Sequence, residues 1–227
     1  MRKAGEPESE AWLRSYHSDV GTERRTKAMP AKLQALGIEL EPSPIDVLDL
    51  CCGNGEALET LYEAGYRNLL GVDMTPSPRL LEERRFAVRA GDACATELPP
   101  ESQDLILVLH ALHHMRDAKT VETLIDECWR VLRPGGRIAI VDFPNSPQIQ
   151  LAFWFFRRQQ FLFTPYLKYF GALIRDEWPF LKDYLPEFHK VWAVLTAKRF
   201  EIVLERHRLF YFYLTLRKPD GALAHAR

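Results

Sequence analysis

The sequence predicts an α/β fold: a doubly wound, mostly parallel sheet of seven strands with an antiparallel edge strand and a helical cap. Strand-like and helix-like segments alternate from residue 45 to residue 142, and such alternation produces right-handed crossovers and a parallel sheet. The runs Val-Leu-Asp-Leu (47–50) and Asp-Leu-Ile-Leu-Val-Leu (104–109) are almost continuously apolar, as expected of strands covered on both faces. A turn rich in glycine follows the first strand.

The elements are expected in a simple order along the chain. Residues 1–10 are polar and predict disorder, 11–36 predict helix, and Gly37 can end that helix. The strands are expected at 45–50, 68–72, 86–89, 104–109, 136–142, 201–205 and 210–216. The helices are expected at 55–64, near 78–84, at 118–132 and within 146–192. The last two strands predict an antiparallel pair at the sheet edge.

Length and composition narrow the class of protein. A chain of 227 residues, 47% of them hydrophobic, suits a single α/β domain with one embellishment. The net charge of −1 and the pI of about 6.7 argue against a nucleic-acid groove, which needs a concentrated basic face. The four cysteines lack Cys-x-x-Cys spacing and predict free thiols, the start of the chain carries no signal peptide, and no apolar run reaches the ~18 residues of a membrane span. We therefore expect a cytoplasmic protein with no transmembrane segment.

The segment 47–55, Val-Leu-Asp-Leu-Cys-Cys-Gly-Asn-Gly, joins a strand to a helix. Glycines allow a sharp turn and let a ligand approach the backbone, and the start of the helix presents unpaired N–H groups. The second strand ends at Asp73, 24 residues after Asp49. A nucleotide-binding βαβ unit places the carboxylate that binds ribose hydroxyls at about this spacing. The pattern indicates an enzyme with an adenosine-containing cofactor.

This segment resembles the first motif of the class I S-adenosylmethionine-dependent methyltransferases, Asp-x-Gly-x-Gly-x-Gly. Asp49, Gly53 and Gly55 match the motif, and Cys51 stands at the position of its first glycine. The dehydrogenase fingerprint Gly-x-Gly-x-x-Gly is not met, because Leu58 occupies the place of the third glycine. S-adenosylmethionine has no pyrophosphate to bind, so the difference favours methyl transfer over hydride transfer.

Residues 131–142 resemble a second hallmark of this family. A helix ends, Pro-Gly-Gly turns the chain, and the fifth strand begins. The matches span about residues 45–143 in the family's order, which implies a Rossmann-like fold with S-adenosylmethionine as cofactor. Outside this core, 16–25 and 183–188 are loosely similar to the ubiquinone/menaquinone biosynthesis C-methyltransferases.

The resemblance also implies which residues bind the cofactor. Asp92, after the third strand, matches the acid that bonds the adenine amino group; capping a turn is its alternative role. The expected cofactor-binding residues are Tyr16, Asp49, Cys51, Gly53, Gly55, Asp73, Met74, Asp92, Ala93 and His110.

Several histidines lie at or near the expected site. His110, immediately past the fourth strand, is expected as the general base, because an imidazole titrates near neutral pH; His17 is the second candidate. His113 or His114 is expected to pack and to form hydrogen bonds under the site. No companion acid for a metal is apparent, so we expect no metal ion.

The stretch 151–170 holds nine aromatic residues among twenty. It predicts a helical lid, either packed on the sheet or lining a pocket for an aromatic or lipophilic acceptor. In the second case, Phe156, Phe163 and Tyr166 are expected to bind the acceptor. A surface helix that touches a membrane and a dimer interface remain alternatives, so peripheral membrane contact stays open, as does the choice between monomer and homodimer.

We expect one domain: an N-terminal helical arm (1–44), a cofactor-binding core (45–143), a helical cap insertion (144–197), and C-terminal edge strands with a tail (198–227). The expected function is S-adenosylmethionine-dependent methyl transfer to a small, apolar or aromatic metabolite. The alternatives are a protein or nucleic-acid methyltransferase and a non-catalytic binding protein with this fold. The near-neutral charge argues against a nucleic-acid partner.

Overall fold

The computed structural model describes residues 19–115, 117–157, 165–197, 199–208 and 210–221, and side chains within 22–155 and from 177 onward in those ranges. The strands are β1 Val47–Leu50, β2 Leu69–Asp73, β3 Ala87–Ala90, β4 Gln103–Leu109, β5 Leu132–Asp142, β6 Glu201–His207 and β7 Phe212–Arg217. The helices are α2 Asp19–Ala35, α3 Glu56–Glu63, α4 Pro78–Leu81, the 3-10 helix η1 Leu112–His114, α5 Ala118–Val131, α6 Pro147–Arg157 and α7 Pro165–Leu195.

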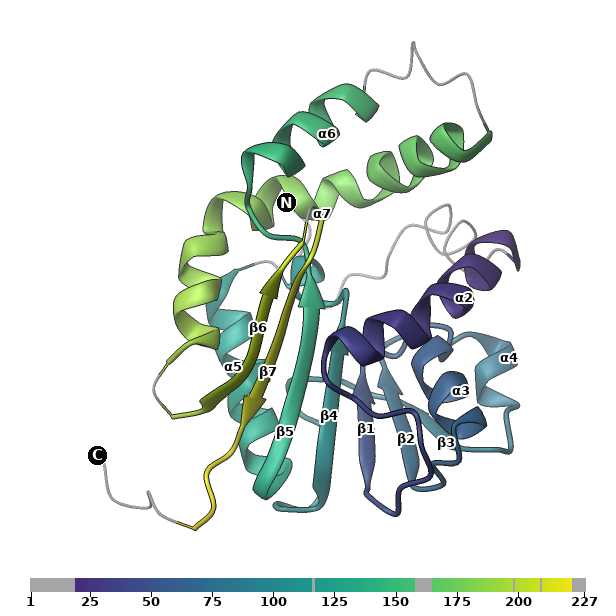
Figure 1. Cartoon of the computed structure of the whole chain (residues 1–227), viewed down its shortest axis with the longest axis vertical. Coiled ribbons are helices and arrows are strands. Elements are labelled where there is room, and N and C mark those ends of the chain that lie inside the picture. Colours follow the sequence, from purple (N-terminus) through teal and green to yellow (C-terminus); the bar gives the residue numbers. More distant parts are fainter. Residues whose placement is uncertain (1–18, 116, 158–164, 198, 209, 222–227) are drawn as a thin grey trace.

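The seven strands form one sheet in the order β3-β2-β1-β4-β5-β7-β6, with helices on both faces (Figure 1). Neighbours among β1 to β5 are parallel, and β7 runs antiparallel to both β5 and β6. The predicted α/β fold and its antiparallel edge pair are confirmed, with β7 inserted one place in from the edge. The strand order reverses between β1 and β4, and open α/β sheets bind ligands outside the carboxyl ends of the strands at such a point.

The fifth strand begins at Leu132, earlier than the sequence predicts. Leu132 pairs with Gln103 of β4, and the register shifts between Gln103 and Leu105. Gly135 has a φ of +77°, and its N–H donates to the carbonyl of Lys218 over 2.8 Å. The expected Pro-Gly-Gly turn is therefore present, but its hydrogen bonds keep it within the sheet.

Side chains of the strands alternate between two core layers. Leu48 and Leu50 belong to the layer beneath α5 and α7, whereas Val47 belongs to the layer beneath α2 and α3. All four residues of β1 are buried. The sheet is thus covered on both faces, as its apolar runs predict.

The helix α2 forms part of the second core layer. Its residues Met29 and Leu33 are buried, as is Leu36 just after its end. The hydroxyl of Thr215 in β7 donates to the carbonyl of Leu36 over 2.8 Å. The segment expected as an arm therefore packs along the sheet from β1 to β7, and it brings the side chains of α2 to the ligand-binding edge.

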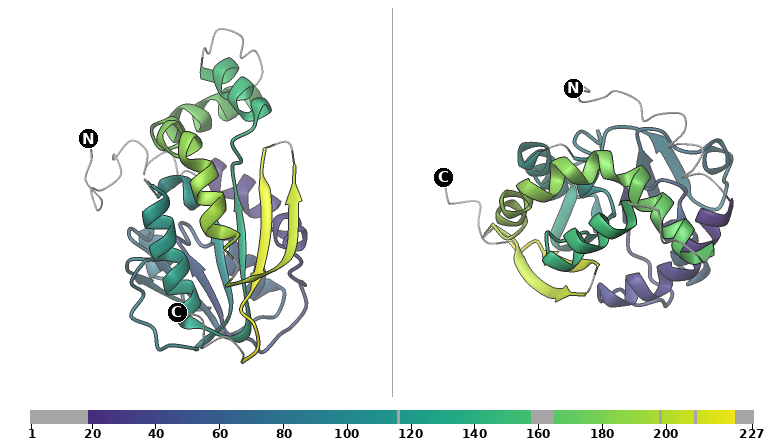
Figure 2. Two further views of the ribbon diagram at one scale, coloured as in Figure 1. Left: turned by 90° about the vertical axis from the view of Figure 1, so that its left-hand side faces the viewer. Right: turned by 90° about the horizontal axis from the view of Figure 1, so that it is seen from above.

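The cap helices α6 and α7 leave the alternating pattern. Figure 1 shows α6 and the first part of α7 beyond the carboxyl end of β5, and the view from above in Figure 2 shows both helices crossing over the sheet. The rest of α7 packs against α5. Pro179 and Pro186 lie inside α7, and each removes an intrahelical hydrogen bond, which allows the change of direction seen in Figure 1.

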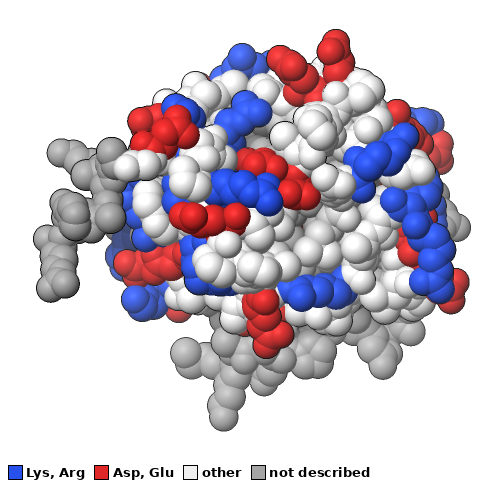
Figure 3. All heavy atoms as spheres, turned by 90° about the horizontal axis from the view of Figure 1, so that it is seen from below, with Lys and Arg blue, Asp and Glu red and all other residues white. Residues whose placement is uncertain are grey.

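Within the part of the chain that the structure describes, every helix is too short or too polar to cross a bilayer. On the face seen from below, basic and acidic side chains are intermingled rather than gathered by sign (Figure 3). Such a face does not resemble the concentrated basic surface of a nucleic-acid groove.

A close approach of β2 to α3 yields a test of the packing. A Cβ added at Gly71 would lie 2.8 Å from Cys52 Sγ and 2.8 Å from Leu58 Cδ1. Gly71→Ala should therefore lower the free energy of unfolding by about 1–3 kcal/mol, measured by urea denaturation. Ala87→Ser adds one heavy atom at an exposed position of the adjacent strand. This control should change the free energy of unfolding by less than about 0.5 kcal/mol. Equal stability of the two variants would show that this layer has spare room.

Candidate functional site

The turn between β1 and α3 contains three residues with positive φ: Cys51 at +58°, Gly53 at +56° and Gly55 at +79°. Cys51 adopts the left-handed conformation at the place of the motif's first glycine, and its N–H donates to the carbonyl of Val72 over 2.8 Å. The φ of +79° at Gly55 is one that residues with a Cβ rarely adopt, and Leu80 Cδ1 lies 2.5 Å from where that Cβ would be, so glycine is favoured there. Gly55 is also the N-cap of α3 and brings no side chain, which leaves the start of the helix to a ligand.

Asp73 lies at the end of β2, directly beside this turn. Its Oδ2 accepts a hydrogen bond from the N–H of Gly53 at 2.9 Å, and its Oδ1 accepts one from the N–H of Thr75 at 2.8 Å. The two bonds hold the carboxylate at the carboxyl edge of the sheet, next to the glycine turn. A carboxylate in this position of a βαβ unit can bind ribose hydroxyls.

Asp49 lies in β1 under the same turn and is buried. Burial raises the pKa of its carboxyl well above the ordinary value, and the charges of Glu56 and Asp73 add to the effect. A protonated Asp49 can donate as well as accept a hydrogen bond in the floor of the site. Arg25 of α2 donates its Nε to Oε1 of Glu56 over 2.6 Å, and this ion pair docks α2 on the turn.

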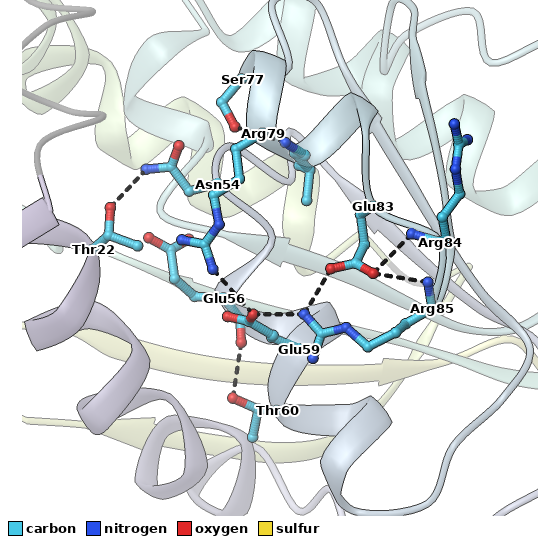
Figure 4. Close-up of polar contacts among 11 residues, drawn as sticks. Thr22, Asn54, Glu56, Glu59, Thr60, Ser77, Arg79, Glu83, Arg84 and Arg85 are labelled. Atoms are coloured by element: carbon cyan, nitrogen blue, oxygen red, sulfur yellow. Dashed lines mark hydrogen bonds and ion pairs between the residues drawn. The ribbon is translucent and has the colours of Figure 1, made fainter.

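Polar contacts also join α2, α3 and α4 around the turn (Figure 4). Asn54 donates its side-chain amide to the hydroxyl of Thr22 over 3.2 Å. Glu59 of α3 pairs with Arg79 at 3.5 Å and with Arg85 at 2.8 Å. Exposed pairs of this kind contribute little stability each. Their consequence here is positional, because they link the helices that surround the glycine turn.

The residues expected near the adenine follow β2 and β3. The Oδ1 of Asp92 accepts the N–H of Cys94 at 2.8 Å, so this exposed carboxylate caps a turn. Ala93 is buried, whereas Met74 has 60% of its surface exposed just after Asp73. The thioether of Met74 offers an apolar surface beside the carboxyl end of β2.

His110 follows β4 directly and contacts a lysine of α2. Its φ is +56°, and its Nε2 lies 2.7 Å from the Nζ of Lys32. Burial lowers the pKa of His110 well below the ordinary value, and the charge of Lys32 lowers it further. Burial likewise lowers the pKa of Lys32 to about 8. His110 is therefore neutral at neutral pH, and Lys32 can exchange a proton close to it.

Two aromatic rings enclose the pair of His110 and Lys32. Tyr211 lies edge-on to His110 with 4.8 Å between ring centroids, and the Nζ of Lys32 is 5.5 Å from the centre of the Tyr211 ring. Phe143, directly after β5, lies 6.0 Å from His110 and 5.2 Å from Tyr211. These apolar surroundings account for the lowered pKa values, and they can keep water from reacting groups.

Some expected site residues lie where the structure gives no side chain. Tyr16, His17 and Phe163 are outside the described residues, and the side chains of Phe156 in α6 and Tyr166 in α7 are not described. Their expected roles remain predictions.

The sequence pattern did not indicate Lys32, Phe143 or Tyr211. Phe143 carried a usable signal, because it follows β5 at the carboxyl edge just as His110 follows β4. Lys32 and Tyr211 come from a helix and an edge hairpin, and only tertiary packing brings these elements to His110.

His113 and His114 lie in η1, beneath the cap. The Nδ1 of His113 is 2.8 Å from Oδ1 of Asp142, and its Nε2 is 3.2 Å from Oε2 of Glu177. Burial lowers the pKa of His113, but the carboxylates of Asp142 and Glu177 outweigh it and raise the pKa to about 10. His113 is a buried hydrogen-bonding residue, as expected. The companion acid that the sequence did not reveal is Glu177 of α7.

Comparisons with known proteins agree with this geometry. A family model described as a methyltransferase domain matches residues 48–140. The chain is 29% identical over 184 residues to a demethylmenaquinone methyltransferase of Thermus thermophilus. The aligned region covers 77% of this chain and 76% of that protein. It is 32% identical over 164 residues to an uncharacterized methyltransferase of Synechocystis. The aligned region covers 70% of this chain and 68% of that protein.

Solved structures show the same fold. The N-methyltransferase NodS from Bradyrhizobium japonicum, in complex with S-adenosyl-L-homocysteine, has a TM-score of 0.56 at 17% identity and covers 93% of this chain and 98% of its own. A SAM-dependent methyltransferase from Methanosarcina mazei has a TM-score of 0.54 at 21% identity and covers 78% of this chain and 94% of its own. Because the sequence relatives, the glycine turn and the strand order agree, we conclude that the chain belongs to the class I S-adenosylmethionine-dependent methyltransferases.

Proposed function

We propose that this methyltransferase acts on a small, apolar or aromatic molecule that binds between His110 and the helical cap. The observation that carries the proposal is the aromatic enclosure at the carboxyl edge of the sheet. Phe143 and Tyr211 pack around His110, and Phe143 contacts Phe153 of α6 with 5.9 Å between ring centroids. An apolar ring would shed water on entering such surroundings, at about 25 cal/mol per Å² of apolar surface.

The names of several relatives support this acceptor class. A 2-phytyl-1,4-naphtoquinone methyltransferase of Thermosynechococcus vestitus is 27% identical over 176 residues, and a ubiquinone/menaquinone biosynthesis C-methyltransferase of Paracoccus denitrificans is 28% identical over 153 residues. We carry over the chemical class alone: an apolar ring that bears oxygen substituents.

In this proposal the cofactor lies across the ends of β1, β2 and β3. Asp73 binds the ribose hydroxyls, the turn from Cys51 to Gly55 receives the methionine part, and Met74 and Asp92 flank the adenine. The sulfonium already activates the methyl group. The enzyme must therefore align donor and acceptor in line and exclude water, and this positioning supplies much of the rate.

A ring hydroxyl becomes a better nucleophile when it loses its proton. The negative charge of the resulting oxygen can also be delocalised onto a ring carbon, which then becomes the nucleophile. We assign the proton acceptor to the pair of Lys32 and His110. The amine of Lys32 is neutral above its lowered pKa of about 8, and the 2.7 Å contact with the neutral His110 holds it at the end of β4. His110 is then the group next to the transferring methyl, and Lys32 receives the proton.

The apolar surface of α6 favours contact with lipid or with a lipophilic acceptor. Leu151, Trp154 and Phe155 have 63%, 50% and 41% of their surfaces exposed. Large apolar side chains gathered on one exposed helix are uncommon on a monomeric surface. They are consistent with peripheral contact with a membrane, from which an apolar acceptor could enter beneath the cap.

The cofactor assignment predicts the effect of removing the ribose carboxylate. Asp73→Ala should weaken binding of S-adenosylmethionine or S-adenosylhomocysteine by about 1.5–3 kcal/mol, the scale of a hydrogen bond to a charged group, as measured by calorimetry. Glu122→Ala, on the exposed face of α5, should leave both affinities unchanged. Binding of NAD with no binding of either sulfur compound would contradict the assignment.

The proton-acceptor assignment predicts a particular pH profile. With an acceptor that must lose a proton, kcat should rise as the pH approaches 8 and level off above it, because burial lowers the pKa of Lys32 to about 8. Lys32→Met and His110→Ala should each lower kcat by about 100-fold or more while the cofactor Kd changes little. Lys27→Met, on the exposed side of α2, is the matched control. Unchanged turnover in His110→Ala would assign His110 a scaffold role and leave His17 as the next candidate.

The cap assignment predicts a change in acceptor recognition. Serine substitutions at Phe156, Phe163 and Tyr166 should each raise the KM of an apolar acceptor and leave cofactor affinity almost unchanged, because the proposal assigns these three aromatic residues to the acceptor. Ile202→Ser removes an exposed apolar side chain from β6 and should leave the KM unchanged. Unaltered acceptor kinetics in all three cap variants would instead assign the segment to core packing or to an oligomer interface.

A further inference from the structure

A cluster at the junction of η1, β5 and α7 is not used by the proposed methyl transfer. One ring nitrogen each of His113 and His114 and a carboxylate oxygen of Glu177 lie within 4.8 Å of one another. His113 and Glu177 are buried, and His114 is half-buried. We infer that these three side chains form a binding site for a divalent transition-metal ion.

Asp142 holds His113 in an orientation suited to this role. Its Oδ1 lies 2.8 Å from Nδ1 of His113 and accepts the N–H of Phe143 at 2.7 Å, and its Oδ2 accepts the backbone N–H of His113 at 3.2 Å. A neutral His113 therefore carries its proton on Nδ1 and presents the Nε2 lone pair toward Glu177. A carboxylate that bonds the far nitrogen of an imidazole in this way orients many metal-binding histidines.

Two of the three distances between the candidate ligand atoms also fit one bound ion, and the ring nitrogens of the two histidines lie within 4.8 Å of each other. A tetrahedral ion with bonds of about 2.0–2.1 Å separates its ligand atoms by about 3.4 Å. Oε2 of Glu177 lies 3.2 Å from Nε2 of His113 and 3.6 Å from Nε2 of His114. The longer distance exceeds that of a hydrogen bond but suits two ligands of the same ion. Two imidazoles and one carboxylate are a ligand set for Zn²⁺, with one position left for water or another oxygen.

The buried carboxylates also favour a cation in this place. Asp142 and Glu177 are both buried beside His113. A positive charge stabilises buried carboxylates, and a divalent ion held by His113, His114 and Glu177 would supply one.

The candidate ligands come from two parts of the chain that are far apart in sequence. His113 and His114 follow β4, whereas Glu177 belongs to the long cap helix α7, which packs on η1. A bound ion would thus tie the cap to the end of the sheet. This role does not depend on the identity of the methyl acceptor.

Calorimetry with zinc alone tests the site. The full-length protein, freed of metal by a chelator and dialysed, should bind about one Zn²⁺ per chain, and Zn²⁺ should raise its Tm. Co²⁺ in place of Zn²⁺ should give the visible absorption of a tetrahedral nitrogen and oxygen site. Glu177→Gln and His114→Ala should lower the Zn²⁺ affinity at least about tenfold, and Asp142→Asn should lower it by about 10–100-fold through the orientation of His113.

The double variant Glu205→Gln/His207→Ala is the matched control, because it removes an exposed histidine–carboxylate pair, 3.1 Å apart, from the edge strand β6. It should bind Zn²⁺ as the wild type does. Circular dichroism checks that each variant is folded. If His114→Ala does not fold, the nearly isosteric Glu177→Gln tests the site by itself. Wild-type protein that binds no Zn²⁺, or a folded Glu177→Gln variant that keeps wild-type affinity, would overturn the proposal and leave His113 as a protonated partner of the two carboxylates.

Discussion

The left-handed turn after β1 constrains the geometry of the whole ligand-binding edge. Cys51, Gly53 and Gly55 all have positive φ, and this allows the chain to leave a fully buried strand and to begin α3 directly above it. The N–H of Gly53 then meets the carboxylate of Asp73, so the turn also sets the position of the end of β2. Leu80 of α4 packs where a side chain at position 55 would lie. A different turn would displace three neighbouring elements together.

The helix α2 changes the electrostatics of that edge. Its ion pair from Arg25 to Glu56 docks it on the start of α3, and its Lys32 reaches the end of β4. Burial at this edge lowers the pKa of Lys32 and raises the pKa of Asp49, because it penalises the charged form of each. The charge of Lys32 in turn adds to the lowering of the pKa of His110. The helix α2 thus contributes Arg25 and Lys32 to this edge of the sheet.

Two consecutive residues at the end of β5 contact different parts of the molecule. Asp142 bonds His113 and so connects with η1 and the cap helix α7. Phe143 instead packs against His110 and Tyr211, next to the proposed methyl-transfer position. The cap and the reacting groups are therefore held by the same short stretch of chain. A shift of α7 relative to the sheet would displace His110 through the ring of Phe143, since packed interiors transmit small displacements.

The sequence by itself determined the order of strands and helices, the glycine turn, and the carboxyl edge of the sheet as the place of Asp49, Asp73 and Asp92. These features depend on local patterns: apolar periodicity, turn residues, and the rule that parallel strands end at one edge. Only the tertiary structure decided that Lys32 contacts His110 and that Glu177 faces His113 and His114. Each of these contacts joins segments far apart in the chain. The rotation of a helix about its axis and its docking angle depend on the packing of all its neighbours, and no local pattern specifies them.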